Sequence, residues 1–403
     1  MNIESKISLS LGLLSLIFIP YIYGIKIVDI ILLLSLPILF LYVIYLKKID
    51  KLSLLALSLF GTFIIISIDG AIFNTESYKG IFVAIRYFLV LLIVISLFNI
   101  NKKYFIFFKK GFLISAYITV FWMIVDTIYY YFIGHGISIN QYLFSNFIIG
   151  NEHDLTNRFA IGSLPLFLRA SGFGWDPGGI APALLIAYII NDFEKIYNKN
   201  WFLIIGIFLS ISKTSILILF IYFIYKIIMK VNFKLSKIFL ISIFIAIFII
   251  SSSVNGNETD PAKAGNIRHI KYPSSIIYLF ESSPSEMLLG YGYRGTGEFF
   301  YKYVPWFKNN GIAYSYRESK NKVVESTFTN LFLYSGILGS AMLIFMLIYI
   351  WVYGDKEEFT VIYFLMLGYV GYTFENLWSN FVIFSIVIEI MYRLSYKKQG
   401  SKI

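Results

Sequence analysis

Cysteine is absent from this sequence, and charged residues are scarce. Among the 403 residues there is no cysteine, only three are histidine, 14% are charged and 58% are hydrophobic. The absence of cysteine excludes disulfides and any mechanism that uses a thiol. A water-soluble domain of this length would not tolerate a mean hydropathy of +0.74. The composition therefore predicts an integral membrane protein.

Sequence motifs that hold phosphates or metals are also lacking. The chain has no GxxxxGKS or GxGxxG loop, no HExxH helix and no Asp-x-Asp at an outer helix end. We therefore expect neither a cofactor nor a metal ion. The formal net charge of +11 arises largely from lysines beside apolar segments, as the positive-inside rule requires. It does not indicate a nucleic-acid partner.

Long apolar runs, by contrast, recur along the whole chain. A helix needs about 20 apolar residues to cross a bilayer, and no alternating pattern of membrane strands is present. We predict one polytopic, all-α membrane domain over residues 1–403 with about twelve transmembrane helices. The predicted spans are 7–23, 26–46, 52–69, 80–98, 105–133, 177–191, 200–212, 214–230, 236–254, 326–353, 358–375 and 377–393.

The turn "SKTS" between the runs 200–212 and 214–230 decides the topology, because a single helix there would invert everything after it. With two helices, most lysines lie inside, and only Lys26, Lys79 and Lys213 fall in short outer turns. The positive-inside rule favours this arrangement and places both termini in the cytoplasm. The first apolar run shows no cleavage site, and we interpret it as a retained helix.

Two outer segments are too long to be simple turns, namely 134–176 and 255–325. They contain all three histidines of the chain. The second loop is rich in aromatic residues, which predicts a folded loop rather than disorder. Within it, "SSIIYLFESSP" predicts a short amphipathic helix and "GYGYRGTGEFF" a tight glycine-rich turn. Its rings suit sugar stacking and an interfacial belt equally well.

Three cations stand beside predicted outer helix ends, where a lipid diphosphate would lie. These are Arg169, Lys213 and Arg268. Arginine suits phosphate because its planar fork donates two parallel hydrogen bonds, and each charge-assisted bond contributes about 1.5–3 kcal/mol. Several such groups would together stabilise a departing diphosphate. For the other arginines of the two loops, taken singly, we favour neutralisation of local carboxylates or anchoring at headgroups.

Glu325 is the best candidate for a general base. It precedes "STFTNLFLYSGILG", and a helix N-terminus there would favour its ionised form. The alternative is a helix-terminal charge and nothing more. His269, next to Arg268, is a rival base. Asp176 we interpret as an N-cap before Pro177, the first helical residue.

Two charges fall inside predicted spans, Arg86 and Asp126. A charge at the bilayer centre costs about 2.5–3.5 kcal/mol on insertion scales, so each should face the bundle interior. We prefer a structural ion pair between them to a role in substrate binding.

The order of these features resembles the O-antigen polymerase and O-antigen ligase superfamily of bacterial membrane glycosyltransferases. The matching features are "RASGF" before a helix, the Ser-Lys-Thr turn between two short spans, a large outer loop with "LLGYGY", and "YSGILG" in a late helix. The resemblance implies a GT-C-like bundle in the bacterial inner membrane, with its active site facing the periplasm or cell exterior. It also implies inverting, metal-independent transfer of a glycan from undecaprenyl diphosphate.

The resemblance also implies roles for individual residues. Arg268 would hold the lipid diphosphate, and Lys213 occupies a position where the family has arginine, without the bidentate fork. Arg169 resembles the arginine of the first outer loop, although the Arg-x10-Gly pattern fails because Ile180 stands at its end. Glu325 stands eleven residues before Gly336, where ligases have histidine. That departure favours a polymerase.

We also place His269, Tyr291 and Arg294 among the substrate-binding residues. The sequence-based hypothesis is a polymerase of lipid-linked repeat units of O-antigen or capsule. Its partners would be undecaprenyl-diphosphate-linked oligosaccharides, the lipid bilayer and, as an open alternative, a chain-length regulator. The competing hypotheses are a ligase that moves glycan to lipid A core, a lipid-linked oligosaccharide flippase or other transporter, and a membrane scaffold with an outer receptor loop. The inverted repeat of many secondary transporters is not evident.

Overall fold

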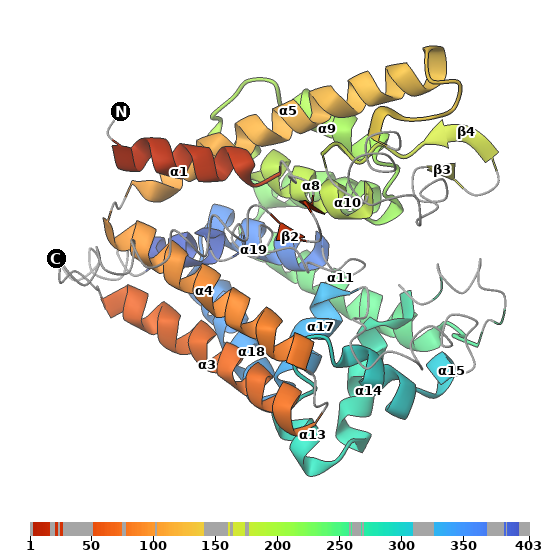
Figure 1. The fold of residues 1–403 in the computed structure, drawn as a ribbon. Coiled ribbons are helices and arrows are strands. Elements are labelled where there is room, and N and C mark those ends of the chain that lie inside the picture. Colours follow the sequence, from red (N-terminus) through yellow and green to blue (C-terminus); the bar gives the residue numbers. More distant parts are fainter. Residues whose placement is uncertain are drawn as a thin grey trace. The chain divides into compact units, whose positions relative to one another are not determined.

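The computed structural model describes residues 3–16, 21–22, 25–26, 51–74, 78–100, 103–140, 160–161, 164–173, 177–257, 270–308, 326–368 and 385–394, with single residues 259, 267 and 383. Within these residues the regular secondary structure is helical apart from two short antiparallel ribbons (Figure 1). It forms two compact units. Unit 1 comprises 1–50, 92–221 and 376–389, and unit 2 comprises 51–91, 222–375 and 390–403.

Unit 1 is built around the long helix α5, along which α1 lies (Figure 1). A Cβ on Gly12 of α1 would collide with the Phe108 carbonyl, and one on Gly111 of α5 with the Leu9 carbonyl. Glycines therefore let the two backbones touch, as in many membrane helix pairs. The described elements of unit 1 are α1 (Ile3–Leu14), β1 (Tyr21–Ile22), β2 (Ile25–Lys26), α5 (Tyr104–Phe132), β3 (Ala160–Ile161), β4 (Leu164–Leu168), α8 (Pro177–Glu194) and α9 (Asn200–Leu209).

The two ribbons of unit 1 are short. In the first, Tyr21 pairs with Lys26. In the second, which lies within the predicted first outer loop, Ala160 pairs with Leu168. In the second ribbon, β4 ends at Leu168 and leads directly into Arg169.

Unit 2 contains the predicted second outer loop and the helices around it. Here α3 packs against α13 and α18. The division between the units falls inside α4 (Tyr78–Ile100) and α10 (Lys213–Val231). The other described elements of unit 2 are α3 (Lys51–Phe73), α11 (Phe233–Ser253), the 3-10 helix η2 (Pro273–Glu281), α13 (Pro284–Leu289), α14 (Thr296–Tyr303), α15 (Pro305–Lys308), α17 (Thr327–Tyr334), α18 (Gly336–Tyr353) and α19 (Lys356–Gly368).

Five helical stretches of the described part are long and apolar enough to cross a membrane. They are Gly80–Asn99, Tyr104–Phe132, Lys213–Val231, Phe233–Ser253 and Gly336–Tyr353. The prediction of a helical membrane protein is confirmed by these helices. The number of twelve spans stays a prediction, and the predicted span 26–46 lies outside the described residues.

The predicted separation at "SKTS" is confirmed, because α9 ends at Leu209 and α10 begins at Lys213. Between them Ile211 has φ 48°, in the left-handed region, which no helix interior adopts. The predicted start of a helix at Pro177 is confirmed as well. Asp176, its predicted N-cap, lies outside the described residues.

The prediction of one continuous helix over 326–353 is wrong. The helix is broken between α17 and α18, where Gly336 has φ 55°. The carbonyls of Leu333 and Tyr334, which a continuous helix would use four residues later, accept hydrogen bonds from the "GYGY" segment instead. The Tyr291 N–H donates to Leu333 at 2.8 Å and the Gly292 N–H to Tyr334 at 3.0 Å. A long-range backbone pairing therefore replaces one helical turn.

Candidate functional site

The "RASGF" phrase, residues 169–173, is anchored along α5 in unit 1. At its start, the Leu168 N–H donates to the Tyr131 hydroxyl at 3.2 Å. At its other end, Gly172 has φ 61°, and a Cβ there would collide with the Thr119 side chain. Only glycine combines that backbone conformation with so close an approach.

Asn140 clamps the same phrase to α5. Its Nδ2 donates to the Gly172 carbonyl at 2.6 Å and to the Ser171 hydroxyl at 3.1 Å. Its Oδ1 accepts from the Trp122 indole N–H at 2.9 Å, and Trp122 stacks on Phe173 with ring centroids 5.3 Å apart. All polar groups of the Asn140 amide are thus used inside the fold, so Asn140 positions the phrase.

The structure joins the two segments that carry Arg169 and Lys213 within unit 1. The Ala170 N–H donates to the Leu209 carbonyl at 3.0 Å, which joins the residue after Arg169 to the end of α9. Four residues beyond Leu209 stands Lys213, the exposed first residue of α10. The turn between the helices is fixed by the Ser212 hydroxyl, which lies 3.2 Å from that of Ser215.

Arg169 itself is half-buried. Its Nε is shielded from solvent and has no hydrogen-bond partner among the described residues. No carboxylate of the described residues pairs with Arg169, which leaves it available to an anion. This differs from Arg393 of unit 2, whose guanidinium lies 2.9 Å from the Glu357 carboxylate.

Three other predicted site residues, Arg268, His269 and Glu325, lie outside the described residues. The helix after Glu325 begins at Thr327, and its N-cap is Ser326, whose hydroxyl accepts from the Thr329 N–H at 3.3 Å. The cap of α17 is therefore Ser326. Whether Glu325 acts as a base stays a prediction.

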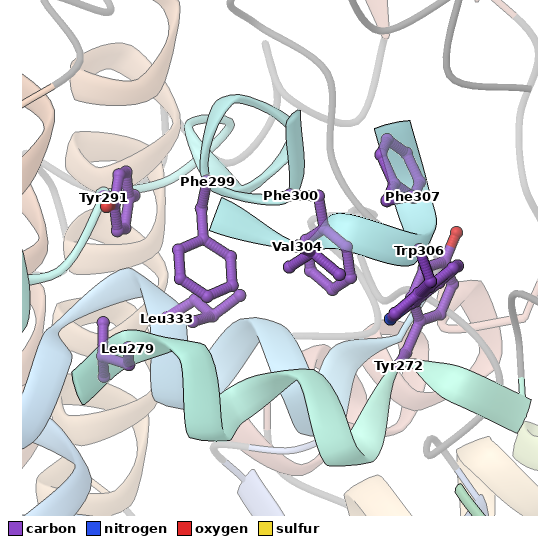
Figure 2. Close-up of a cluster of buried hydrophobic side chains, with 9 residues drawn as sticks. All are labelled: Tyr272, Leu279, Tyr291, Phe299, Phe300, Val304, Trp306, Phe307 and Leu333. Atoms are coloured by element: carbon purple, nitrogen blue, oxygen red, sulfur yellow. The ribbon is translucent and has the colours of Figure 1, made fainter. Parts of the chain in front are cut away.

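The described part of the predicted second outer loop is folded, as its aromatic content predicts. Figure 2 shows the cluster of rings packed between η2 and the segment of α14 and α15. Tyr272 lies 5.3 Å from Phe300 and Tyr291 lies 5.1 Å from Phe299, centroid to centroid. The segment predicted as a short amphipathic helix forms η2. These rings stabilise the loop by packing on one another. The cluster consists of Tyr272, Leu279, Tyr291, Phe299, Phe300, Val304, Trp306, Phe307 and Leu333.

Tyr291 belongs to this cluster and is fully buried. Burial raises the pKa of its hydroxyl above the ordinary range, and the nearby Glu286 carboxylate raises it further. Arg294, two residues before α14, is half-buried with φ 66°. Tyr291 and Arg294 both lie in the turn before α14, and the predicted tight turn is confirmed by Gly290 and Gly292 at φ 75° and 66°.

Glu286 is a buried carboxylate that sequence reasoning missed. It accepts from Lys302 Nζ at 2.7 Å, from the Tyr303 hydroxyl at 2.6 Å and from the Ser283 hydroxyl at 2.8 Å. Burial alone would raise its pKa, but these hydrogen bonds outweigh burial and lower the pKa of Glu286 to about 2. So weak a base holds the loop together rather than accepting protons. The pattern Ser283-x-x-Glu286 is a capping box, and this was the available signal.

A second buried charge cluster lies in unit 1. Lys109 of α5 contacts the Glu194 carboxylate and lies 2.8 Å from that of Glu389. It joins α5, α8 and the C-terminal helical residues. The sequence predicted an ion pair elsewhere, between Arg86 and Asp126, which belong to different units. That pair stays a prediction.

Comparison of the chain with protein-family models, with curated proteins and with solved structures gives no match. Assignment of a function therefore depends on the residues and their geometry.

Proposed function

We propose that this protein is a membrane glycosyltransferase that polymerises lipid-linked polysaccharide repeat units. The observation that supports the proposal best is the corner of unit 1, where the Ala170–Leu209 hydrogen bond joins the phrase of Arg169 to the turn of Lys213. Two cations beside a membrane helix end suit a lipid diphosphate, whose charge increases as it leaves. Because Arg169 Nε has no partner among the described residues, phosphate would not have to displace a carboxylate from it.

The proposed reaction is an inverting transfer. The hydroxyl of an acceptor sugar attacks the anomeric carbon of the donor glycan from the face opposite the diphosphate. A new glycosidic C–O bond forms, the C–O bond to the diphosphate breaks, and the diphosphate leaves with the electron pair. Glu325 takes the hydroxyl proton, and Arg169, Lys213 and Arg268 stabilise the leaving group. The roles of Glu325 and Arg268 rest on the family resemblance.

The test is polymerisation by purified full-length protein supplied only with lipid-linked repeat units. We expect a ladder of longer chains. Removing one charge-assisted bond of about 1.5–3 kcal/mol in Arg169→Ala should slow elongation by about 10- to 150-fold. Arg169→Lys should retain part of the rate, because it keeps the charge and loses the fork. Arg393→Ala is the matched control, since Arg393 pairs with Glu357.

Three other results would contradict the proposal. A ladder of unchanged rate in Arg169→Ala and Lys213→Ala would remove the assigned role of this corner. A product formed only when lipid A core is supplied would indicate the ligase. Movement of lipid-linked sugar between leaflets without a new glycosidic bond would indicate the flippase.

A further inference from the structure

Asp126 of α5 is the most unusual charged residue of unit 1. It is fully buried. Its Oδ1 accepts hydrogen bonds from the backbone N–H of Ile139 at 2.6 Å and of Asn140 at 3.4 Å. Its Oδ2 is equally buried and has no hydrogen-bond partner among the described residues. A buried carboxylate oxygen without a partner is costly, and such an atom in a folded protein requires an explanation.

Two more buried polar atoms without partners occur in unit 1, one on α5 and one in the phrase that runs along it. They are Thr119 Oγ1 and Arg169 Nε, again among the described residues. Thr119, Met123 and Asp126 stand at positions i, i+4 and i+7, so they share one face of the helix. Gly172 packs against Thr119 and Met123 on that face.

The path of the "RASGF" phrase connects these atoms. Just before Arg169, the chain forms a hydrogen bond with Tyr131 of α5, and just after it Gly172 packs against Thr119 of α5. Thr119 and Tyr131 flank Asp126 in the sequence of α5. Arg169 therefore lies between two contacts with α5, one on each side of Asp126. Asn140 links them directly. Its backbone N–H reaches Asp126 and its side-chain amide reaches Ser171 and Gly172.

The chemistry of this group matches a sugar better than a phosphate. A carboxylate oxygen accepts hydrogen bonds from hydroxyl groups, whereas it would repel an anion placed beside it. The threonine hydroxyl both donates and accepts, and the guanidinium donates. Next to them the half-buried Trp122 is fixed by its stack on Phe173 and its bond to Asn140. A few placed polar groups beside aromatic rings are typical of small-ligand sites.

We propose that Asp126, Thr119 and Arg169 form a saccharide-binding site on α5. In it, Asp126 Oδ2 and Thr119 Oγ1 bind hydroxyl groups of the sugar next to the lipid diphosphate. Arg169 stands at the boundary between this sugar and the diphosphate. The inference rests on the proposed function and specifies the part of the substrate that unit 1 recognises. Asp126 is a binding residue here, and proton transfer stays with Glu325.

The test measures binding, without turnover, to full-length protein in detergent. The probes are inorganic diphosphate and the free repeat-unit oligosaccharide released by mild acid from the lipid-linked donor of the host cell. Isothermal titration calorimetry gives the Kd of each. We expect Asp126→Asn to weaken binding of the oligosaccharide by about tenfold or more, because one charge-assisted bond is lost. Binding of diphosphate should stay unchanged or become slightly tighter. Asp69→Asn, on α3 of unit 2, is the matched control.

Thr119→Val is the second variant, because it removes the hydroxyl, keeps the shape and leaves the bonds between Asp126 and the backbone in place. It should also weaken binding of the oligosaccharide, and a thermal unfolding measurement is the control for an intact fold. If Asp126→Asn lowers Tm by several degrees, Thr119→Val decides. The site would be overturned if the properly folded variants bind the oligosaccharide with the wild-type Kd. It would also be overturned if they lose affinity for the oligosaccharide and for diphosphate equally. If sugar binding depends on Asp126 but the protein has no polymerase activity, the saccharide site stands and only the proposed reaction is wrong.

Discussion

Gly336 offers the sharpest test of how the fold of unit 2 is held. It has φ 55° at the break between α17 and α18. A Cβ there would lie 2.6 Å from Gly290 N, from the Leu288 carbonyl and from the Met287 carbonyl. All three are backbone atoms, so no flexible side chain can move aside. Gly336→Ala must therefore displace the chain that carries the "GYGY" turn.

The expected cost follows from two terms. A left-handed conformation costs an L-residue about 1–2 kcal/mol. Displacement of the turn also weakens the two hydrogen bonds to the Leu333 and Tyr334 carbonyls, each contributing about 0.5–1.5 kcal/mol. Gly336→Ala should thus lower the free energy of unfolding by about 2–5 kcal/mol.

The assay is equilibrium unfolding in mixed micelles, followed by tryptophan fluorescence. Two controls separate the terms. Gly136→Ala pays only the conformational cost, since Gly136 has φ 88° and its nearest neighbour, the Tyr130 hydroxyl, would lie 4.0 Å from a Cβ. Gly61→Ala, within α3, meets only ordinary contacts and should be neutral or stabilising. A Gly336→Ala protein as stable as Gly61→Ala would refute the assigned packing.

Three further outcomes can be measured in the same way. For Glu286, hydrogen bonds outweigh burial and hold its folded pKa at about 2, below its ordinary 4.5; its stabilising contribution is present above pH 4.5 and is lost as the pH falls toward 2, and Glu286→Gln should flatten that part of the unfolding-against-pH curve. Ser326→Ala should cost about 0.5–2 kcal/mol as loss of an N-cap, whereas Glu325→Gln should leave stability unchanged and stop elongation. Asn140→Ala should lower both Tm and elongation rate, because it releases the phrase that carries Arg169, whereas Arg169→Ala should lower the rate alone; equal Tm losses in both would contradict the separation of anchoring from chemistry.

Local patterns account for the parts of the fold that the sequence predicted. Proline at the start of α8 and the short polar turn before α10 act within a few residues, so their effects can be read from the chain. Asn140 and Asp126 could not be assigned in this way. The Asn140 side chain binds Ser171 and Gly172, and the Asp126 side chain binds the backbone of residues 139 and 140. Nothing in the local pattern around either residue indicates such contacts. The break at Gly336 was missed for the same reason, since it depends on a segment more than forty residues earlier.

The packing changes how strongly each phrase that matches the glycosyltransferase superfamily supports the proposed function. "GYGY" and "YSGILG" touch each other: a Cβ on Gly290 would collide with Gly336 N and the Leu333 carbonyl. Glycines in those phrases are therefore required by a backbone junction, whatever reaction the protein catalyses. The same holds for Gly172 in "RASGF". A resemblance in these glycines therefore indicates a shared backbone packing before it indicates a shared reaction. Arg169 is different, because no packing requirement explains a buried Nε without a partner among the described residues. The proposed chemistry must therefore be judged on Arg169 and Asp126, whose substitution can alter binding while the glycine junctions stay intact.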